Sequence, residues 1–272
     1  MINVLEPQNE ILKQFVDSIY ILKKDTTGFE FTAYPSTNIP VALLRDATVS
    51  VKDELISVNG SDTPNYLGIA CNQFSSSVHV EYLQLVDEIA INFKPLGFSS
   101  YTRTKPEGAK VFPFNEWNTS LPELFRVVFE TSNQQQQLYH IEQFLLERYT
   151  RLSDETALLK ALELLTYTTV DYKMQQIADN IGLHYKQLYR LFTENIGCTP
   201  AHYRKLVKFR SSVISKLRNR DNVRLVDICY AHDYTDQPYF IKQFKELTGE
   251  KPKRFFKDVT SFGNDKVIFK ID

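Results

Sequence analysis

Short apolar runs separated by turn residues fill the first hundred positions of this 272-residue chain. Two runs, at 39–44 and 66–71, are almost continuously apolar. Two others, at 78–85 and 89–93, alternate apolar and polar positions with a period close to two. Both patterns are typical of β-strands when turn residues flank them. We therefore expect a β-rich N-terminal region.

The spacing becomes helical after residue 121. Apolar positions recur every three or four residues over 121–130, over 137–149 and in a third segment that ends at Leu165. An earlier segment, 10–21, fits a helix or a strand equally well. The third segment begins a region in which helical spacing continues.

The predicted fold class is α+β. We expect a β-rich, barrel-like sensor or dimerisation domain with terminal helices at residues 1–150. An all-α domain with two helix-turn-helix units is expected at 151–258, followed by a tail at 259–272. The tail alternates over 266–271, which fits either a strand added to a sheet edge or a disordered end.

The all-α prediction depends on an internal repeat within residues 174–257. The first copy reads Ile177-Ala178, Gly182, Leu188, Phe192, Gly197, Pro200 and Tyr203, and the second reads Ile228-Cys229, Asp233, Phe240, Phe244, Gly249, Pro252 and Phe255. The offset is 51 residues up to Asp233 and 52 beyond it, so the second copy has one extra residue in its turn.

Each repeated position has a physical role in a helix-turn-helix unit. Ala178 is small enough for a second helix to cross closely. Gly182 stands where a chain that leaves a helix often needs a positive φ. Asp233 takes this place in the second copy, and Asp tolerates the left-handed region better than most residues. The repeat therefore predicts two helix-turn-helix units.

Residues 200–218 predict one long helix between the two units. Its apolar stripe consists of Tyr203, Leu206, Val207, Val213, Ile214 and Leu217. A rigid connection would let two recognition helices enter successive major grooves of double-stranded DNA, about 34 Å apart.

Charge supports a nucleic-acid partner for the repeat. Residues 1–170 carry 13 Lys and Arg against 21 Asp and Glu, a net charge of −8. Residues 171–257 carry 17 against 9, a net charge of +8, which the overall value of −1 conceals. A basic module beside an acidic one is typical of polyanion binding.

The same residues resemble the DNA-binding domain of the AraC family of bacterial transcription regulators. The resemblance lies in Leu188 to Phe192, Gly197 to Pro200, Leu225 to Ala231, Asp236 to Phe240, Phe244-Lys245, Gly249 and Pro252. The family usually has Gly where Asp233 stands, Phe at Tyr234 and Ser at Pro238. The resemblance implies a sequence-specific regulator that binds promoter or operator DNA, and RNA polymerase if it is an activator.

The resemblance also implies an N-terminal domain for effector binding, dimerisation or both. Tyr34-Pro35, Gly68 and Ile91 to Pro95 resemble a sensor domain found in some family members. A small-molecule effector is a possible partner, and Tyr34, Tyr66, Tyr82 and Phe93 are the candidate ligand-binding residues. Helix 137–149 is a candidate seam for a homodimer, although its stripe could equally pack on the domain's own sheet.

Exposed positions early in each recognition helix are the candidate DNA contacts. They are Tyr185, Lys186, Gln187, Tyr189 and Arg190 in the first helix, and Gln237, Pro238, Tyr239 and Lys242 in the second. Arg and Lys can read guanine, and Gln can read adenine. Cations of the long helix, with Lys253 and Arg254, are expected to touch phosphate or nothing.

Other chemistry finds little support in the sequence. The five histidines show no metal-ligand spacing, so we expect no metal site. Cys71, Cys198 and Cys229 lie far apart, which fits a reducing, cytoplasmic setting. No phosphate-binding or dinucleotide motif is present, so we expect no cofactor and no enzyme activity. No window approaches about 18 uncharged apolar residues, so we expect no membrane segment.

Two alternatives remain open at this point. The first is a catalytic or ligand-binding β domain fused to a DNA-binding module, for which Cys71 alone offers little. The second is a protein-interaction module whose basic faces are incidental and whose binding lacks a steep salt dependence.

Overall fold

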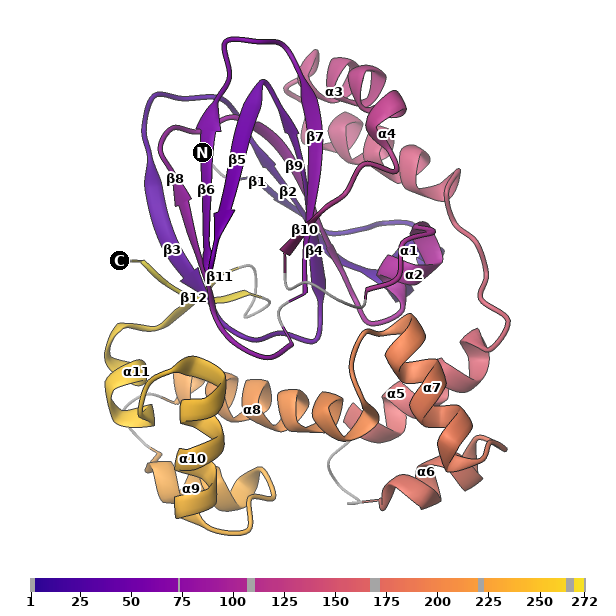
Figure 1. The fold of residues 1–272 in the computed structure, drawn as a ribbon, viewed down its shortest axis with the longest axis vertical. Coiled ribbons are helices and arrows are strands. Elements are labelled where there is room, and N and C mark those ends of the chain that lie inside the picture. The colour runs from indigo at the N-terminus through magenta and orange to yellow at the C-terminus, as the bar shows by residue number, and fades with distance from the viewer. Residues whose placement is uncertain are drawn as a thin grey trace.

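The computed structural model describes residues 3–72, 74–106, 111–166, 172–219, 223–262 and 267–271. A strand-rich half lies above the long helix α8 (Pro200–Arg218), and a helical unit lies at each end of that helix (Figure 1). The last strands of the chain lie beside the strand-rich half rather than with the helices that precede them (Figure 1).

The described strands form two six-stranded sheets. The first has the order β1 (Asn3–Leu5), β2 (Val16–Leu22), β9 (Asp87–Phe93), β4 (Ile39–Arg45), β7 (Tyr66–Cys71) and β10 (Val111–Pro113). The second has the order β11 (Thr260–Phe262), β12 (Val267–Ile271), β3 (Phe29–Ala33), β8 (Val78–Tyr82), β6 (Leu55–Gly60) and β5 (Ala47–Lys52). Among the described strands, only β6 and β8 pair in parallel. The β-rich prediction is confirmed, but the sheets keep separate edge strands and do not close into a barrel.

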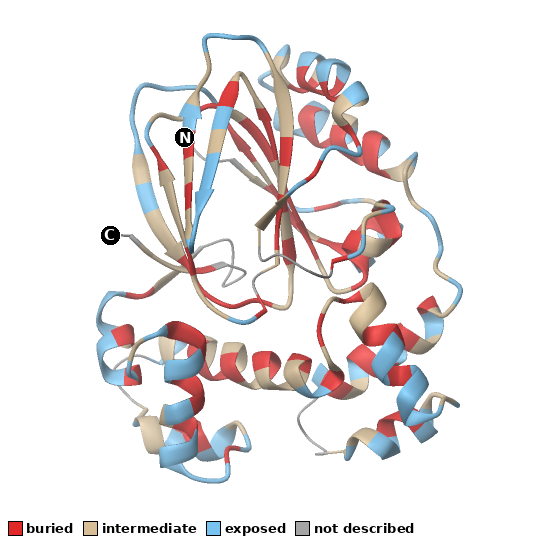
Figure 2. Ribbon diagram, viewed as in Figure 1, coloured by how far each residue is buried: buried red, intermediate tan, exposed pale blue. Residues whose placement is uncertain are grey.

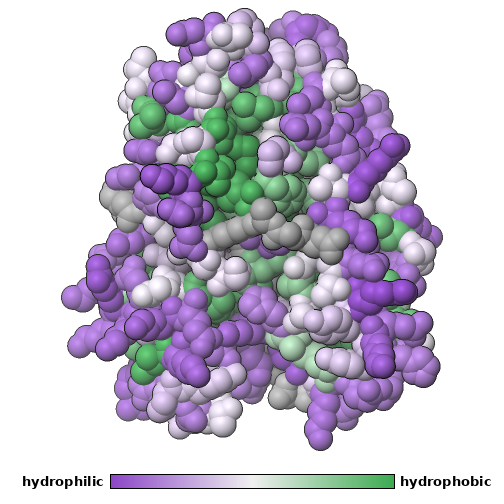
Figure 3. Space-filling view, viewed as in Figure 1, coloured by the Kyte–Doolittle hydropathy of each residue, from purple (hydrophilic) through white to green (hydrophobic). Residues whose placement is uncertain are grey.

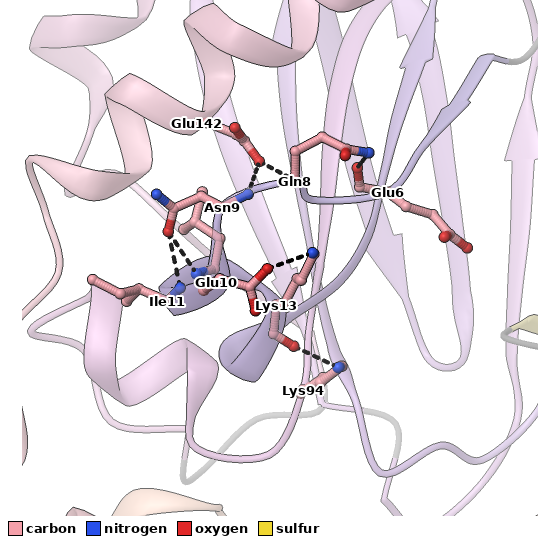
Figure 4. Close-up of polar contacts among 9 residues, drawn as sticks. Glu6, Gln8, Asn9, Glu10, Ile11, Lys13, Lys94 and Glu142 are labelled. Carbon is pink, nitrogen blue, oxygen red and sulfur yellow. Dashed lines mark hydrogen bonds and ion pairs between the residues drawn. The ribbon is translucent and has the colours of Figure 1, made fainter.

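The ambiguous segment 10–21 contains both of the elements that its pattern allowed. Helix α1 (Glu10–Phe15) begins at Asn9, whose side chain accepts hydrogen bonds from the N–H groups of Ile11 and Leu12. Strand β2 follows directly from Val16. The Glu142 carboxylate accepts from the backbone N–H groups of Gln8 and Asn9, at 2.6 and 3.0 Å (Figure 4). A buried carboxylate 133 residues away thus fixes where this helix begins.

Helices cover one face of the first sheet (Figures 1 and 2). They are α2 (Gly97–Tyr101), the 3-10 turn η1 (Asn118–Ser120), α3 (Leu121–Phe129) and α4 (Gln134–Leu146). An aromatic cluster fills this layer, with the ring centroid of Phe93 5.6 Å from that of Tyr101 and 6.3 Å from that of Trp117. Leu138, Ile141 and Leu145 of α4 are buried within the same chain. The stripe expected at a dimer seam is therefore already covered.

The C-terminal half contains α5 (Glu155–Thr166), α6 (Met174–Asn180), α7 (Tyr185–Asn195), α8, α9 (Leu225–Ala231), α10 (Gln237–Thr248) and α11 (Pro252–Asp258). These helices have the order that the repeat predicts, with α8 between two helix pairs. No helix among the described residues is long and apolar enough to cross a membrane.

The turns of the repeat contain the positive φ values that their residues suggested. Gly182 has φ 71° and Asp233 has φ 54°, so the prediction that Asp233 replaces a glycine in the left-handed region is confirmed. Gly197 and Gly249, at φ 89° and 75°, end the second helix of each unit. Their surroundings differ, because a Cβ at Gly249 would meet open space whereas one at Gly197 would overlap the Pro106 carbonyl oxygen.

This difference predicts unequal effects of Gly182→Ala and Gly197→Ala. A Cβ atom added at Gly182 would have no neighbour within 4 Å. Replacement of Gly182 by alanine therefore adds only backbone strain of about 1–2 kcal/mol. Gly197→Ala adds a clash with Pro106 and should destabilise the chain by at least about 1 kcal/mol more. Urea unfolding of the two variants measures the difference. Equal losses of stability would show that the contact with Pro106 does not constrain Gly197.

Candidate nucleic-acid interface and interdomain cavity

The first helix-turn-helix unit is formed by α6 and α7. Ile177 and Ala178 of α6 are buried against Leu188 and Phe192 of α7 in the same core cluster. The N–H of Leu183 donates to the Ala178 carbonyl at 3.0 Å and closes the turn around the left-handed Gly182. The turn thereby directs the start of α7 away from the unit's core.

The second unit repeats this geometry in α9 and α10. The N–H of Tyr234 donates to the Cys229 carbonyl at 3.1 Å around the left-handed Asp233. The Asp236 carboxylate caps α10 by accepting from the N–H of Tyr239 at 2.7 Å. Tyr234 and Phe240 pack with ring centroids 4.9 Å apart. Tyr234 thus fills the place of the family's phenylalanine with an aromatic ring.

All nine sequence-predicted DNA contacts are exposed at the start of the second helix of a unit. They are Tyr185, Lys186, Gln187, Tyr189, Arg190, Gln237, Pro238, Tyr239 and Lys242. The buried Leu188 and Phe240 anchor each helix from its opposite face. Three aromatic rings stand partly in solvent on this surface, with Tyr185 39%, Tyr189 44% and Tyr239 46% exposed.

Several cations of α8 have partners inside the chain. The Lys205 ammonium lies 2.7 Å from the Glu246 carboxylate of α10, and the Lys216 ammonium donates to the Val223 carbonyl at 2.7 Å. These contacts correct the expectation that the cations of the long helix touch phosphate or nothing. They hold both units on α8, since Arg204 also donates to the Tyr172 carbonyl ahead of α6.

The strand-rich half contacts the DNA-binding half near both ends of α8, through α7 and α8 at one end and through α11 at the other. Ser99 donates to the Asn195 carbonyl at 2.7 Å, and His202 Nε2 lies 2.5 Å from the Phe74 carbonyl oxygen. At the other end, the ring centroids of Tyr34 and Phe255 lie 4.6 Å apart. The two helix-turn-helix units are therefore docked against one common body.

A cavity of about 360 Å³ lies between the two sheets and reaches α8. Its wall is mainly apolar, with Leu44, Ile56, Val58, Ile69 and Val80 among the strand residues and Ile268 and Phe269 from β12. Figure 3 shows hydrophobic surface gathered on the face of the strand-rich half in this region. A volume of this size suits a small organic ligand.

Two of the four predicted ligand-binding residues line this cavity. Tyr34 and Tyr82 are in its wall, whereas Tyr66 and Phe93 are not. The Tyr66 ring packs 5.4 Å from that of Phe125 under α3, and Phe93 belongs to the aromatic cluster under α2. Side chains alternate between the two faces of a strand. A shift of one position along β7 or β9 therefore moves a side chain from the cavity to the layer of helices on the other face.

Sequence reasoning missed the polar groups of the cavity. Glu88, only 4% exposed, accepts a hydrogen bond from the Tyr82 hydroxyl at 2.6 Å. Burial raises the pKa of Glu88 to about 7, with the hydrogen bond from Tyr82 opposing the shift. Burial and the neighbouring Glu88 raise the pKa of Tyr82 well above its ordinary value. A single acidic residue in an alternating strand segment is weak evidence for a buried polar site. Only the pairing of the strands shows whether its side chain faces the cavity or the other side of the sheet.

Arg210 of α8 lines the cavity from the helical half, whereas the other lining residues lie in strands, in the segment between β3 and β4, and in β12. Its guanidinium donates to the Pro35 carbonyl at 3.4 Å. Desolvation lowers the pKa of Arg210 to about 10, with Asp17, Tyr20 and Tyr203 opposing the shift, so the group stays charged at neutral pH. Asn92 and Ser36 add polar surface, while no group of three metal-binding side chains occurs among the described residues.

Geometry and sequence together define a helix-turn-helix DNA-binding protein. A family model described as a helix-turn-helix domain matches residues 177–258, which span both units. The matched residues include those in which the repeat resembles the DNA-binding domain of the AraC family. The helix-turn-helix prediction from the repeat is thereby confirmed. No curated protein sequence matches the chain.

Solved structures of ToxT from Vibrio cholerae are among those to which the chain is similar. A 1.65 Å structure is 13% identical with a TM-score of 0.45, covering 94% of this chain and 98% of that chain. A ToxT structure from strain O395 is 14% identical with a TM-score of 0.43, covering 90% and 98% of the two chains. A third, with an unsaturated fatty acid bound, is 14% identical with a TM-score of 0.43, covering 87% and 92%.

The Glu88–Tyr82 pair predicts that Glu88→Gln changes stability in a pH-dependent way. A folded pKa near 7, above the ordinary 4.5, makes the wild-type chain lose stability as pH rises between these values. Gln keeps an acceptor for Tyr82 and removes the charge. The variant should match the wild type near pH 4.5 and exceed it by at most about 3 kcal/mol at pH 8. Denaturant unfolding across this range provides the measurement, and a constant difference at all pH values would contradict it.

Proposed function

We propose that this regulator binds specific operator sequences with α7 and α10 in successive major grooves. The observation that carries the proposal is the duplicated unit, whose two exposed helix starts are held at opposite ends of α8. A 19-residue helix spans about 28 Å, so units at its ends have separations comparable to one turn of DNA. The basic net charge of 171–257 supports attraction to phosphate.

Within this surface, Arg190 and Lys242 are the proposed main contacts. Each follows the buried anchor of its helix by two residues, and each is exposed. Tyr185, Lys186, Gln187, Tyr189, Gln237, Pro238 and Tyr239 complete the proposed contact set. Contacts with RNA polymerase and a homodimer remain predictions.

The second part of the proposal concerns the cavity, which we assign to a small, mainly apolar effector. Apolar side chains from both sheets form most of its wall. The polar groups in the wall are the hydrogen-bonded Glu88 and Tyr82, and also Arg210 and Asn92. An elongated molecule with polar ends suits this distribution. Because Arg210 belongs to α8, such a ligand would touch the DNA-binding half directly.

DNA binding is tested with fragments of the DNA upstream of the chain's own coding sequence, at several salt concentrations and with unrelated competitor. Arg190→Ala and Lys242→Ala should each weaken specific binding by about 1–3 kcal/mol if they read a base. Lys52→Ala, on an exposed strand end of the other half, is the matched control and should change nothing. Wild-type binding that is weak, competitor-sensitive and insensitive to both substitutions would overturn the proposal.

The cavity is tested with the apolar dye 1-anilinonaphthalene-8-sulfonate and an Ala42→Phe variant. Ala42 lines the cavity, so a phenyl group there would occupy ligand space. We expect dye binding to weaken by tenfold or more, the equivalent of about 1.4 kcal/mol. Val51→Phe, at a position 50% exposed on β5, is the control for an added ring. Equal dye affinity in both variants would place the dye elsewhere and count against the effector site.

A further inference from the structure

The C-terminal strap, defined as residues 259–262 and 267–271, joins the end of the DNA-binding half to the other half. It follows α11 directly, and Val259 at its start is only 1% exposed. Strand β12 lies beside β3 (Figure 1) and pairs with it antiparallel. In this pairing Phe269 is opposite Ala33 and Lys270 is opposite Thr32. The second helix-turn-helix unit is thus followed by a strand of the opposite half's sheet.

The strap is also part of the cavity wall. Ile268 and Phe269 line the cavity beside Ala33 and Tyr34, and Ile268 is only 1% exposed. The Ile268 carbonyl accepts a hydrogen bond from the N–H of Tyr34 at 3.2 Å. A ligand that needs more room at this end of the cavity must therefore displace β12.

From the same wall, a chain of aromatic contacts leads into the recognition helix. Tyr34 packs on Phe255 of α11 at 4.6 Å between ring centroids, and Phe255 packs on Phe244 of α10 at 4.9 Å. Phe244 packs on Phe240 at 5.5 Å. Phe240 directly follows Tyr239 on the proposed DNA surface. Movement of the strap and Tyr34 would consequently disturb the packing of α10.

The first unit is attached differently. The Ser99–Asn195 and His202–Phe74 hydrogen bonds and the close approach of Gly197 to Pro106 hold it, and none of these involves the strap. Release of β12 would therefore detach only the second unit from the opposite half, while its packing on α8 persists. Short terminal elements open at lower free energy than core strands, which makes β12 suited to reversible release.

We propose that the strap is an intramolecular latch that couples the cavity to DNA binding. When docked, it holds both recognition helices on one frame, so the second contacts DNA without a further ordering cost. A ligand that displaces Ile268 and Phe269 detaches the second unit from the sheet, disturbs the packing of α10 through Tyr34 and weakens DNA binding. The latch depends on the proposed DNA-binding function for its effect, although its docking can be measured without DNA.

The first test compares Lys270→Pro with Lys270→Ala in the full chain. The Tyr34–Ile268 hydrogen bond and antiparallel alternation make Lys270 and Thr32 the next hydrogen-bonded pair. Proline removes the N–H that this pair requires, whereas alanine keeps it. We expect Lys270→Pro to lower operator affinity by about tenfold or more and to speed hydrogen exchange in α10 and α11 but not in α6 and α7. Lys270→Ala should behave as the wild type.

Two results would overturn the latch. One is faster exchange in β12 of Lys270→Pro with operator affinity equal to that of Lys270→Ala. The other is tighter operator binding by Lys270→Pro. If the wild-type chain shows no specific DNA binding, the proposed function fails, and exchange in α10 with and without the dye still decides whether the cavity and the second unit are coupled.

The second test locks the strap with a Thr32→Cys and Lys270→Cys double variant. Neither residue lines the cavity, and directly opposed strand residues lie within the Cα separation that a disulfide spans. The oxidised form should keep wild-type operator affinity and lose the effect of 1-anilinonaphthalene-8-sulfonate on DNA binding, and reductant should restore that effect. Each single-cysteine variant is a control. An equal effect of the dye on oxidised and reduced forms would contradict the proposal.

Discussion

The burial of aromatic side chains along α8 holds the two helix-turn-helix units in one structure. Tyr203 packs on Phe192 of the first unit with ring centroids 6.0 Å apart, and Phe209 packs on Phe244 of the second at 5.2 Å. A helix that packs against both units cannot bend freely between them. Because Arg210 lies on the same helix and lines the cavity, the element that sets the spacing of the units also contacts the site of the proposed effector.

Sequence reasoning succeeded where the determining interactions are local. The repeat identified α6 to α10 because turn glycines, caps and helical stripes act within one unit, and even Asp233 was placed in the left-handed region. The strand-rich half was harder, because alternation shows that a strand has two faces without showing what each face meets. Tyr66 and Phe93 were assigned to a ligand site for this reason, and their aromatic rings belong to the helix layer instead.

Long-range pairing explains the remaining differences from expectation. The start of α1 depends on Glu142, and the wall of the cavity includes Phe269 from the other end of the chain. Neither contact can be predicted from the local spacing of apolar and polar residues. The expected barrel likewise became two sheets because the order of strands depends on partners far apart in the chain, such as β3 and β12. The net charge also suggested more cations on α8 that could contact DNA than the structure provides, because Lys205 and Lys216 have partners within the chain.

The duplication is symmetric in its local geometry and asymmetric in its surroundings. Gly197 and Gly249 end equivalent helices with similar φ values, yet only Gly197 is pressed against the opposite half. The second unit lacks that close approach at its glycine and is joined to the sheet through α11 and a terminal strand. Because the two helix-turn-helix units are attached to the opposite half by different contacts, displacement of β12 affects them differently. In the proposed latch, a change in the cavity therefore acts on α10 through β12 and Tyr34, whereas the contacts that attach α7 to the opposite half do not involve the strap.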